Sequence, residues 1–90
     1  MNKDKTIIDF FGDGCGNCKA LEPIINQLKA EHPEINFQKV NIKDAEDLVE
    51  KYGVSSLPTI VFLRGDEMIE KMTGLKPKVI ITRKIAEVFG

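Results

Sequence analysis

The most informative feature of this chain is a pair of cysteines whose spacing suits redox chemistry. Both cysteines lie in Cys15-Gly16-Asn17-Cys18, where a short apolar run meets an amphipathic helical pattern. If Cys15 lies at or just before the first helical turn, unpaired backbone N–H groups and the helix dipole favour its thiolate. Cys18, one turn further along, could then resolve a mixed disulfide on Cys15. Thiol–disulfide exchange requires these two roles.

Half of a zinc site is the alternative interpretation of the two cysteines. A structural zinc site normally has four ligands, and the only histidine, His32, falls at the far end of the predicted helix. The missing ligands would have to come from carboxylates or from a second molecule. The pattern therefore favours redox chemistry, and we expect no metal or organic cofactor.

Size and composition predict one small domain over residues 1–90. The chain is 42% hydrophobic and 30% charged with a net charge of −1, which gives no electrostatic reason to expect nucleic-acid binding. The apolar run 6–11 is too short and too polar for a signal peptide, and no segment approaches the roughly 20 apolar residues of a membrane span. We expect a cytoplasmic monomer. In the cytoplasm a cysteine pair is more often catalytic or metal-binding than structural.

The elements that must position the cysteines follow from hydrophobic periodicity. Four segments with the composition of strands are 6–11, 35–42, 59–63 and 68–73. A helix that buries one face is predicted from Lys19 to His32, with a kink at Pro23. We expect Asp44 to cap a short acidic helix that stops at Gly53, and a last helix to begin near Pro77, with an apolar face formed by Ile81, Ile85, Val88 and Phe89.

The resulting order is βαβαββα, which belongs to the α/β class. The opening βαβ unit implies a right-handed crossover between two parallel strands. A turn at 64–67 should join the last two strands as a hairpin, which adds antiparallel strands to the same sheet. We therefore expect a four-stranded mixed sheet with helices on both faces.

With these elements in place, the chain resembles the thioredoxin family over almost its whole length. The matching stretches are Ile7–Phe11, Cys15–Lys19, Pro23, Lys39–Ile42, Tyr52–Val54, Leu57–Thr59, Gly65 and Gly74. The resemblance implies a thioredoxin-like fold, trimmed because family members commonly begin with an additional strand and helix. Two departures lie at the cysteines, where Gly14 replaces the usual Trp and Asn17 the usual Pro. They imply a smaller docking rim and a more flexible loop.

The resemblance also assigns roles to residues around the cysteines. Asp9 matches the buried carboxylate that exchanges a proton with the second cysteine, and burial should raise its pKa. Lys39 matches the lysine near that carboxylate and would modulate it, although a solvated strand lysine is the ordinary interpretation.

Substrate binding, by the same resemblance, involves a second segment of the chain. Leu57-Pro58 would be a cis peptide facing the cysteines, and the backbone before Pro58 would pair with an extended substrate segment. Gly74 would line the same groove. Around the cysteines, Gly14, Gly16 and Asn17 would form the rest of the contact surface.

The sequence thus predicts a disulfide reductase in which Cys15 attacks, Cys18 resolves and Asp9 transfers the proton. Its partners would be disulfide-containing proteins and an electron donor, either a thioredoxin reductase or glutathione. Two alternatives remain: a glutaredoxin-like enzyme that depends on glutathione, and a non-catalytic module that binds a partner protein or a shared metal.

Overall fold

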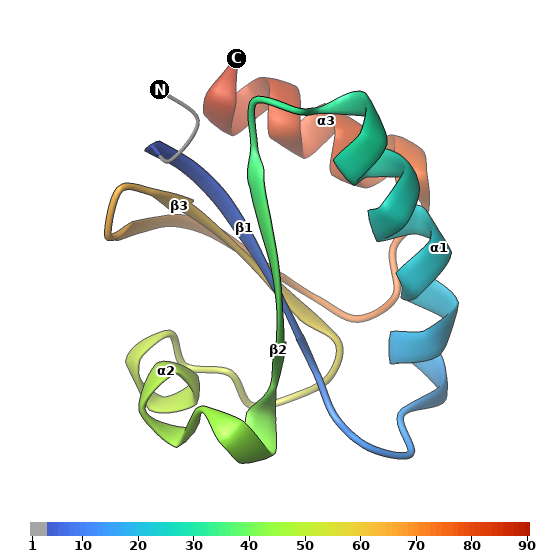
Figure 1. Ribbon diagram of the computed structural model, residues 1–90, viewed down its shortest axis with the longest axis vertical. Helices are drawn as coiled ribbons and strands as arrows, with labels where there is room; N and C mark the ends of the chain where they lie inside the picture. Colours follow the sequence, from blue (N-terminus) through green and yellow to red (C-terminus); the bar gives the residue numbers. More distant parts are fainter. Residues whose placement is uncertain (1–3) are drawn as a thin grey trace.

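The first apolar run forms strand β1, which lies in the interior of a single sheet in the computed structural model of the protein (Figure 1). The structure describes residues 4–90, and the start of the charged N-terminal segment, residues 1–3, lies outside the described residues. The elements are β1 (Lys5–Phe11), α1 (Gly16–Glu31), β2 (Asn36–Asn41), the 3₁₀ turn η2 (Ile42–Asp44), α2 (Glu46–Lys51), β3 (Thr59–Arg64), β4 (Glu67–Thr73) and α3 (Lys78–Phe89). The order βαβαββα is confirmed, with one additional 3₁₀ turn.

The sheet has the order β2-β1-β3-β4 and is mixed, as predicted. Strands β1 and β2 are parallel, and their register places Asp9 opposite Lys39. The other two strand pairs are antiparallel, and β3 and β4 form the predicted hairpin. Since side chains alternate across a strand, Asp9 and Lys39 lie on the same face of the sheet.

Two apolar cores, one on each face of the sheet, follow from the alternation of side chains along β1. Ile7 joins the core beneath α1 and α3, whereas Ile8 and Phe10 join the core beneath α2. The first core also contains the buried faces of the long helices: Leu21, Ile25, Leu28, Ile81, Ile85 and Phe89. Figure 1 shows α1 and α3 together on one side of the sheet and α2 on the other. Helices therefore cover both faces, as the sequence predicts.

Some predicted helix boundaries are wrong. Asp44 does not cap α2; it ends the turn η2, and Ala45 occupies the N-cap position of α2 without a side-chain bond. The side chain of Asn41 accepts the backbone N–H of Lys43 at 3.1 Å, which stabilises this tight turn in place of an earlier helix start. Helix α1 begins at Gly16 rather than Lys19, and it continues through Pro23 to Glu31.

The stop of α2 at Gly53 is confirmed, because the helix ends at Lys51 and Gly53 has a φ of 64°. A left-handed residue just beyond the helix is the usual place for glycine. Lys71 on β4 binds the C-terminal end of α2, since its ammonium donates to the carbonyls of Tyr52 and Gly53 at 3.3 and 3.0 Å. None of the helices formed by residues 4–90 is long and apolar enough to span a bilayer.

Candidate active site

Cys15 is the N-cap residue of α1, although the apolar periodicity predicts a helix only from Lys19. Its backbone is extended (φ −93°, ψ 103°), and its sulfur accepts the backbone N–H of Cys18 at 3.1 Å. Lys19 donates its backbone N–H to the carbonyl of Cys15 at 3.2 Å, which closes the first turn. The sulfur of Cys15 thus lies at the end of the helix where backbone N–H groups are free and the dipole is positive, a position that stabilises a thiolate.

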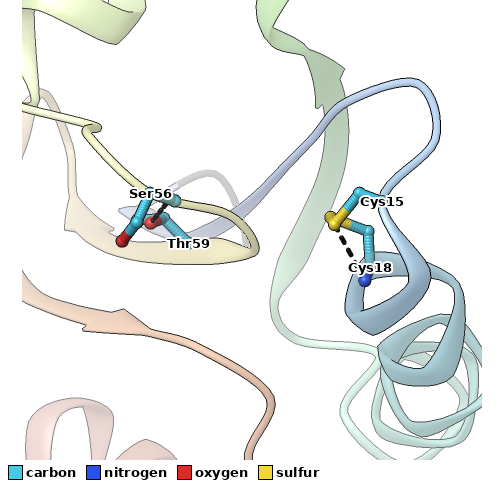
Figure 2. Close-up of a disulfide and its surroundings, with 4 residues drawn as sticks. All are labelled: Cys15, Cys18, Ser56 and Thr59. Carbon is cyan, nitrogen blue, oxygen red and sulfur yellow. Dashed lines mark hydrogen bonds between the residues drawn. A yellow bond between two sulfur atoms is a disulfide. The ribbon is translucent and has the colours of Figure 1, made fainter.

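The two cysteines form a disulfide, with their Cα atoms 5.3 Å apart (Figure 2). They differ in exposure: Cys15 is half-buried, whereas Cys18 is only 8% exposed. The neighbouring Gly14, Gly16 and Asn17 are exposed. A partner molecule can therefore approach Cys15 over this loop, while Cys18 is largely enclosed.

Asp9 is buried on β1, on the same side of the sheet as α1. It is 3% exposed, and its Oδ1 finds no hydrogen-bond partner among residues 4–90. Burial raises the pKa of Asp9 to about 6, and the nearby Lys39 opposes this increase. The predicted burial and the direction of the pKa change are confirmed. A carboxyl group with such a pKa exchanges protons readily near neutral pH.

Lys39 lies next to Asp9 across the strands but is not buried with it. Its side chain is 48% exposed and forms an ion pair with Glu22 of α1. Its ammonium also lies 4.9 Å from the centre of the Phe11 ring. The pKa of Glu22 is lowered, mainly by the hydrogen bond from Lys39. The cation near Asp9 is therefore already paired with another carboxylate.

A cavity of about 500 Å³ opens between the cysteine loop, α1 and β2. Its lining consists of Phe11, Gly12, Asp13, Gly14, Cys18, Lys19, Glu22 and Lys39. The cavity brings the second cysteine and the Glu22–Lys39 pair into one space. Cys18 can thus be reached by water or small solutes from this side.

The second predicted segment, Leu57-Pro58, lies directly before β3, and Figure 2 shows the flanking residues Ser56 and Thr59 in the surroundings of the disulfide. The peptide Leu57–Pro58 is cis, as the resemblance implies. Gly74 donates its backbone N–H to the carbonyl of Pro58 at 2.8 Å, which places these two predicted residues together. The hydroxyl of Thr59 donates to the carbonyl of Ser56 at 2.6 Å and closes the turn around Pro58.

Gly12 joins this segment to the cysteine loop, and the sequence analysis missed it. A Cβ atom on Gly12 would lie 2.8 Å from the Leu57 side chain and 3.6 Å from Ile42. The backbone at this position is therefore in close contact with the segment that carries Pro58. A glycine in the loop after β1 was visible in the sequence, but nothing there indicated the contact.

Charged residues near the cysteines were also missed. Asp13 accepts hydrogen bonds from Asn41 at 3.1 Å and Lys43 at 2.9 Å, so it joins the cysteine loop to the end of β2. The bond from Lys43 lowers the pKa of Asp13. Glu22 lies four residues after Cys18, and this spacing on one helix face was the only signal for it. Within residues 4–90, no group of three or more His, Cys, Asp and Glu side chains could hold a metal ion.

A mixed α/β sheet with a cysteine pair at the N-terminus of its first helix defines the class of thioredoxin-fold thiol–disulfide oxidoreductases. The family model of thioredoxin matches residues 1–87. The chain therefore belongs to the thioredoxin family, and it is a thiol–disulfide oxidoreductase whose redox-active disulfide is the cysteine pair.

Relatives and solved structures agree with this assignment. The thioredoxin of Chlamydia caviae is 40% identical over 79 residues, which are 88% of this chain and 78% of the relative. Thioredoxin-1 of Caenorhabditis elegans is 41% identical over 68 residues, which cover 76% of this chain and 59% of that protein. The structure of oxidised mitochondrial thioredoxin 3 of Saccharomyces cerevisiae superimposes with a TM-score of 0.86 at 27% identity, covering 93% of this chain and 78% of its own. Fasciola hepatica thioredoxin gives a TM-score of 0.87 at 30% identity, with coverages of 96% and 83%.

Proposed function

We propose that the protein is a protein disulfide reductase in which Cys15 is the nucleophile and Cys18 the resolving thiol. The observation that supports this is the position of Cys15 as a half-buried N-cap whose sulfur accepts the N–H of Cys18. This position favours its thiolate and leaves it within reach of a substrate. Cys18 is nearly buried, so a substrate disulfide reaches Cys15 first.

The exchange takes place in two steps. The Cys15 thiolate attacks one sulfur of the substrate disulfide, forms a mixed disulfide and releases the other substrate sulfur as a thiolate, which takes up a proton. Cys18 then transfers its proton to Asp9 and attacks the Cys15 sulfur, releasing the second substrate sulfur as a thiolate, which also takes up a proton. Two electrons pass from the protein dithiol to the substrate, and the Cys15–Cys18 disulfide remains. Lys39 modulates the proton affinity of Asp9.

The substrate would lie as an extended segment along Leu57-Pro58. Strand-like pairing with the backbone before Pro58 would hold it, and Gly74, which is bonded to the Pro58 carbonyl, would line the same groove. Gly14, Gly16 and Asn17 would complete the contact surface around the disulfide. Disulfide-containing proteins are the substrates, and the protein acts in the cytoplasm as a monomer.

Trapping the mixed disulfide tests the roles of the two thiols. Cys18→Ser should accumulate a covalent adduct with a disulfide-containing protein such as insulin, because the resolving thiol is missing. Cys15→Ser should form no adduct and lose catalysed reduction. Intact-mass analysis measures the adduct, and insulin precipitation measures the rate. Reduction by Cys15→Ser at the wild-type rate would show that the mechanism is wrong.

The electron donor is tested separately. We propose a thioredoxin reductase as the donor, so turnover with that enzyme and NADPH should exceed turnover with glutathione. Faster turnover with glutathione would support the glutaredoxin-like alternative. Equilibration with dithiothreitol buffers should place the two-electron potential well below the cytosolic glutathione poise, and a higher potential would indicate an oxidant or isomerase.

A further inference from the structure

Four side chains from three elements, β1, β2 and α1, concern the proposed proton transfer. Asp9 and Lys39 are cross-strand neighbours on β1 and β2. Cys18 and Glu22 are one turn apart on α1, and both line the cavity beside the disulfide together with Lys39. The ion pair between Glu22 and Lys39 links the helix to the sheet at this point. The sequence analysis assigns no role to Glu22.

The pairing of Lys39 with Glu22 has a direct electrostatic consequence for Asp9. Lys39 could neutralise the buried carboxyl group, whose Oδ1 has no hydrogen-bond partner among residues 4–90. Instead its ammonium is bonded to Glu22 and lies over the Phe11 ring. The charge of Glu22 opposes that of Lys39, so the net field that would favour ionised Asp9 is weakened.

We propose that Glu22 is a positioning residue for the exchange: by binding the Lys39 ammonium at the cavity, it keeps Asp9 in the protonated form up to a higher pH. The inference rests on the proposed function, because Asp9 is the proton acceptor there. The charged groups that act on Asp9 are Lys39 of β2 and Glu22 of α1. On β3, the strand partner of Asp9 is Ile60, which is apolar. Cys18 carries no titratable proton while the disulfide is formed.

The titration of Asp9 in the oxidised protein tests this directly, because neither cysteine titrates in that state. Carboxyl-carbon NMR of aspartate-labelled protein gives the midpoint, and the resonance that disappears in Asp9→Asn identifies the residue. Glu22→Gln is the test variant, since Gln keeps the shape and the helix propensity. Glu31→Gln is the matched control: Glu31 lies on the same helix and pairs with Lys78 at 2.5 Å.

We expect the Asp9 midpoint to move to lower pH in Glu22→Gln and to remain unchanged in Glu31→Gln. Lys39→Gln should move it to higher pH, and the effect of Glu22→Gln should be smaller when Lys39→Gln is also present. Added salt should reduce the difference between Glu22→Gln and wild type, because the pair is exposed. In the reduced protein, the rate of mixed-disulfide resolution should reach its plateau at lower pH in Glu22→Gln.

A midpoint that stays constant or rises in Glu22→Gln would overturn the inference. That outcome leaves the proposed function intact if the Cys15 and Cys18 variants behave as expected. A failure of the proposed function would instead appear as insulin reduction that persists in Cys15→Ser. The two failures are therefore distinguishable.

Discussion

Replacing the buried Asp9 by Asn should stabilise the oxidised protein above about pH 6. Burial raises the pKa of Asp9 from 3.8 to about 6. When the pKa of a carboxyl group is higher in the folded than in the unfolded state, the group contributes its full stability at a pH below its pKa in the unfolded state. This contribution is lost as the pH rises through its pKa in the folded state. At about 1.36 kcal/mol per pKa unit, the loss amounts to about 3 kcal/mol. Asn carries no ionisable proton and avoids it.

Urea unfolding of both proteins, followed by circular dichroism between about pH 4 and pH 8, measures this effect. The free energy of unfolding of Asp9→Asn minus that of wild type should increase by about 3 kcal/mol across the range, with most of the increase between about pH 4 and pH 6. Taking the difference at each pH removes the contributions of groups that titrate equally in both proteins. Both samples are kept oxidised so that the cysteines do not titrate.

A difference that is constant across this range would refute the reasoning, because it would mean that Asp9 ionises equally in the folded and unfolded states. Asp13→Asn is a control of opposite sign. The hydrogen bond from Lys43 lowers the pKa of Asp13, so this carboxylate stabilises the folded state above its unfolded pKa of 3.8. Asp13→Asn should therefore be less stable than wild type above that pH, and the difference should vanish as the pH falls further.

Three further substitutions test the packing around the site. Lys71→Met removes the bonds to the carbonyls of Tyr52 and Gly53, so it should lower the free energy of unfolding by about 1 kcal/mol and speed amide exchange in α2. Gly53→Ala should lower it by about 1–2 kcal/mol, since φ is 64°, and equal stability in urea unfolding would contradict the left-handed geometry. Leu28→Ala, at a fully buried position of α1, should lower it by about 2–5 kcal/mol, and a smaller loss would mean that the core closes around the cavity.

The sequence was sufficient to predict the order of the elements, because strand and helix segments differ in the pattern of their apolar residues. The β-branched and aromatic run of β1 predicts a buried strand, and the spacing of the apolar residues of α1 predicts a helix. The sequence was less informative where two nearby side chains could each bond to the backbone at the start of a helix. Asp44 is a residue type common at N-caps, but the hydrogen bond that the Asn41 side chain accepts from the backbone N–H of Lys43 favours a tight turn there.

The N-cap role of Cys15 depends on neighbouring residues only, although the apolar periodicity placed the helix start at Lys19. The N-cap bond joins the sulfur of Cys15 to the backbone N–H of Cys18, three residues away. The burial of Asp9 was expected only from the family resemblance, because a carboxyl group within an apolar strand can also face water.

Residue type and spacing along the chain therefore indicate the pair of thiols and the helix that follows them. The distant groups around the cysteines depend on the tertiary structure. The Glu22–Lys39 pair, the bonds from Asn41 and Lys43 to Asp13, and the Gly12–Leu57 contact each join residues at least 17 positions apart. Such contacts depend on strand register and on how α1 and the loop before β3 pack, and one chain's residue spacing does not encode those distances.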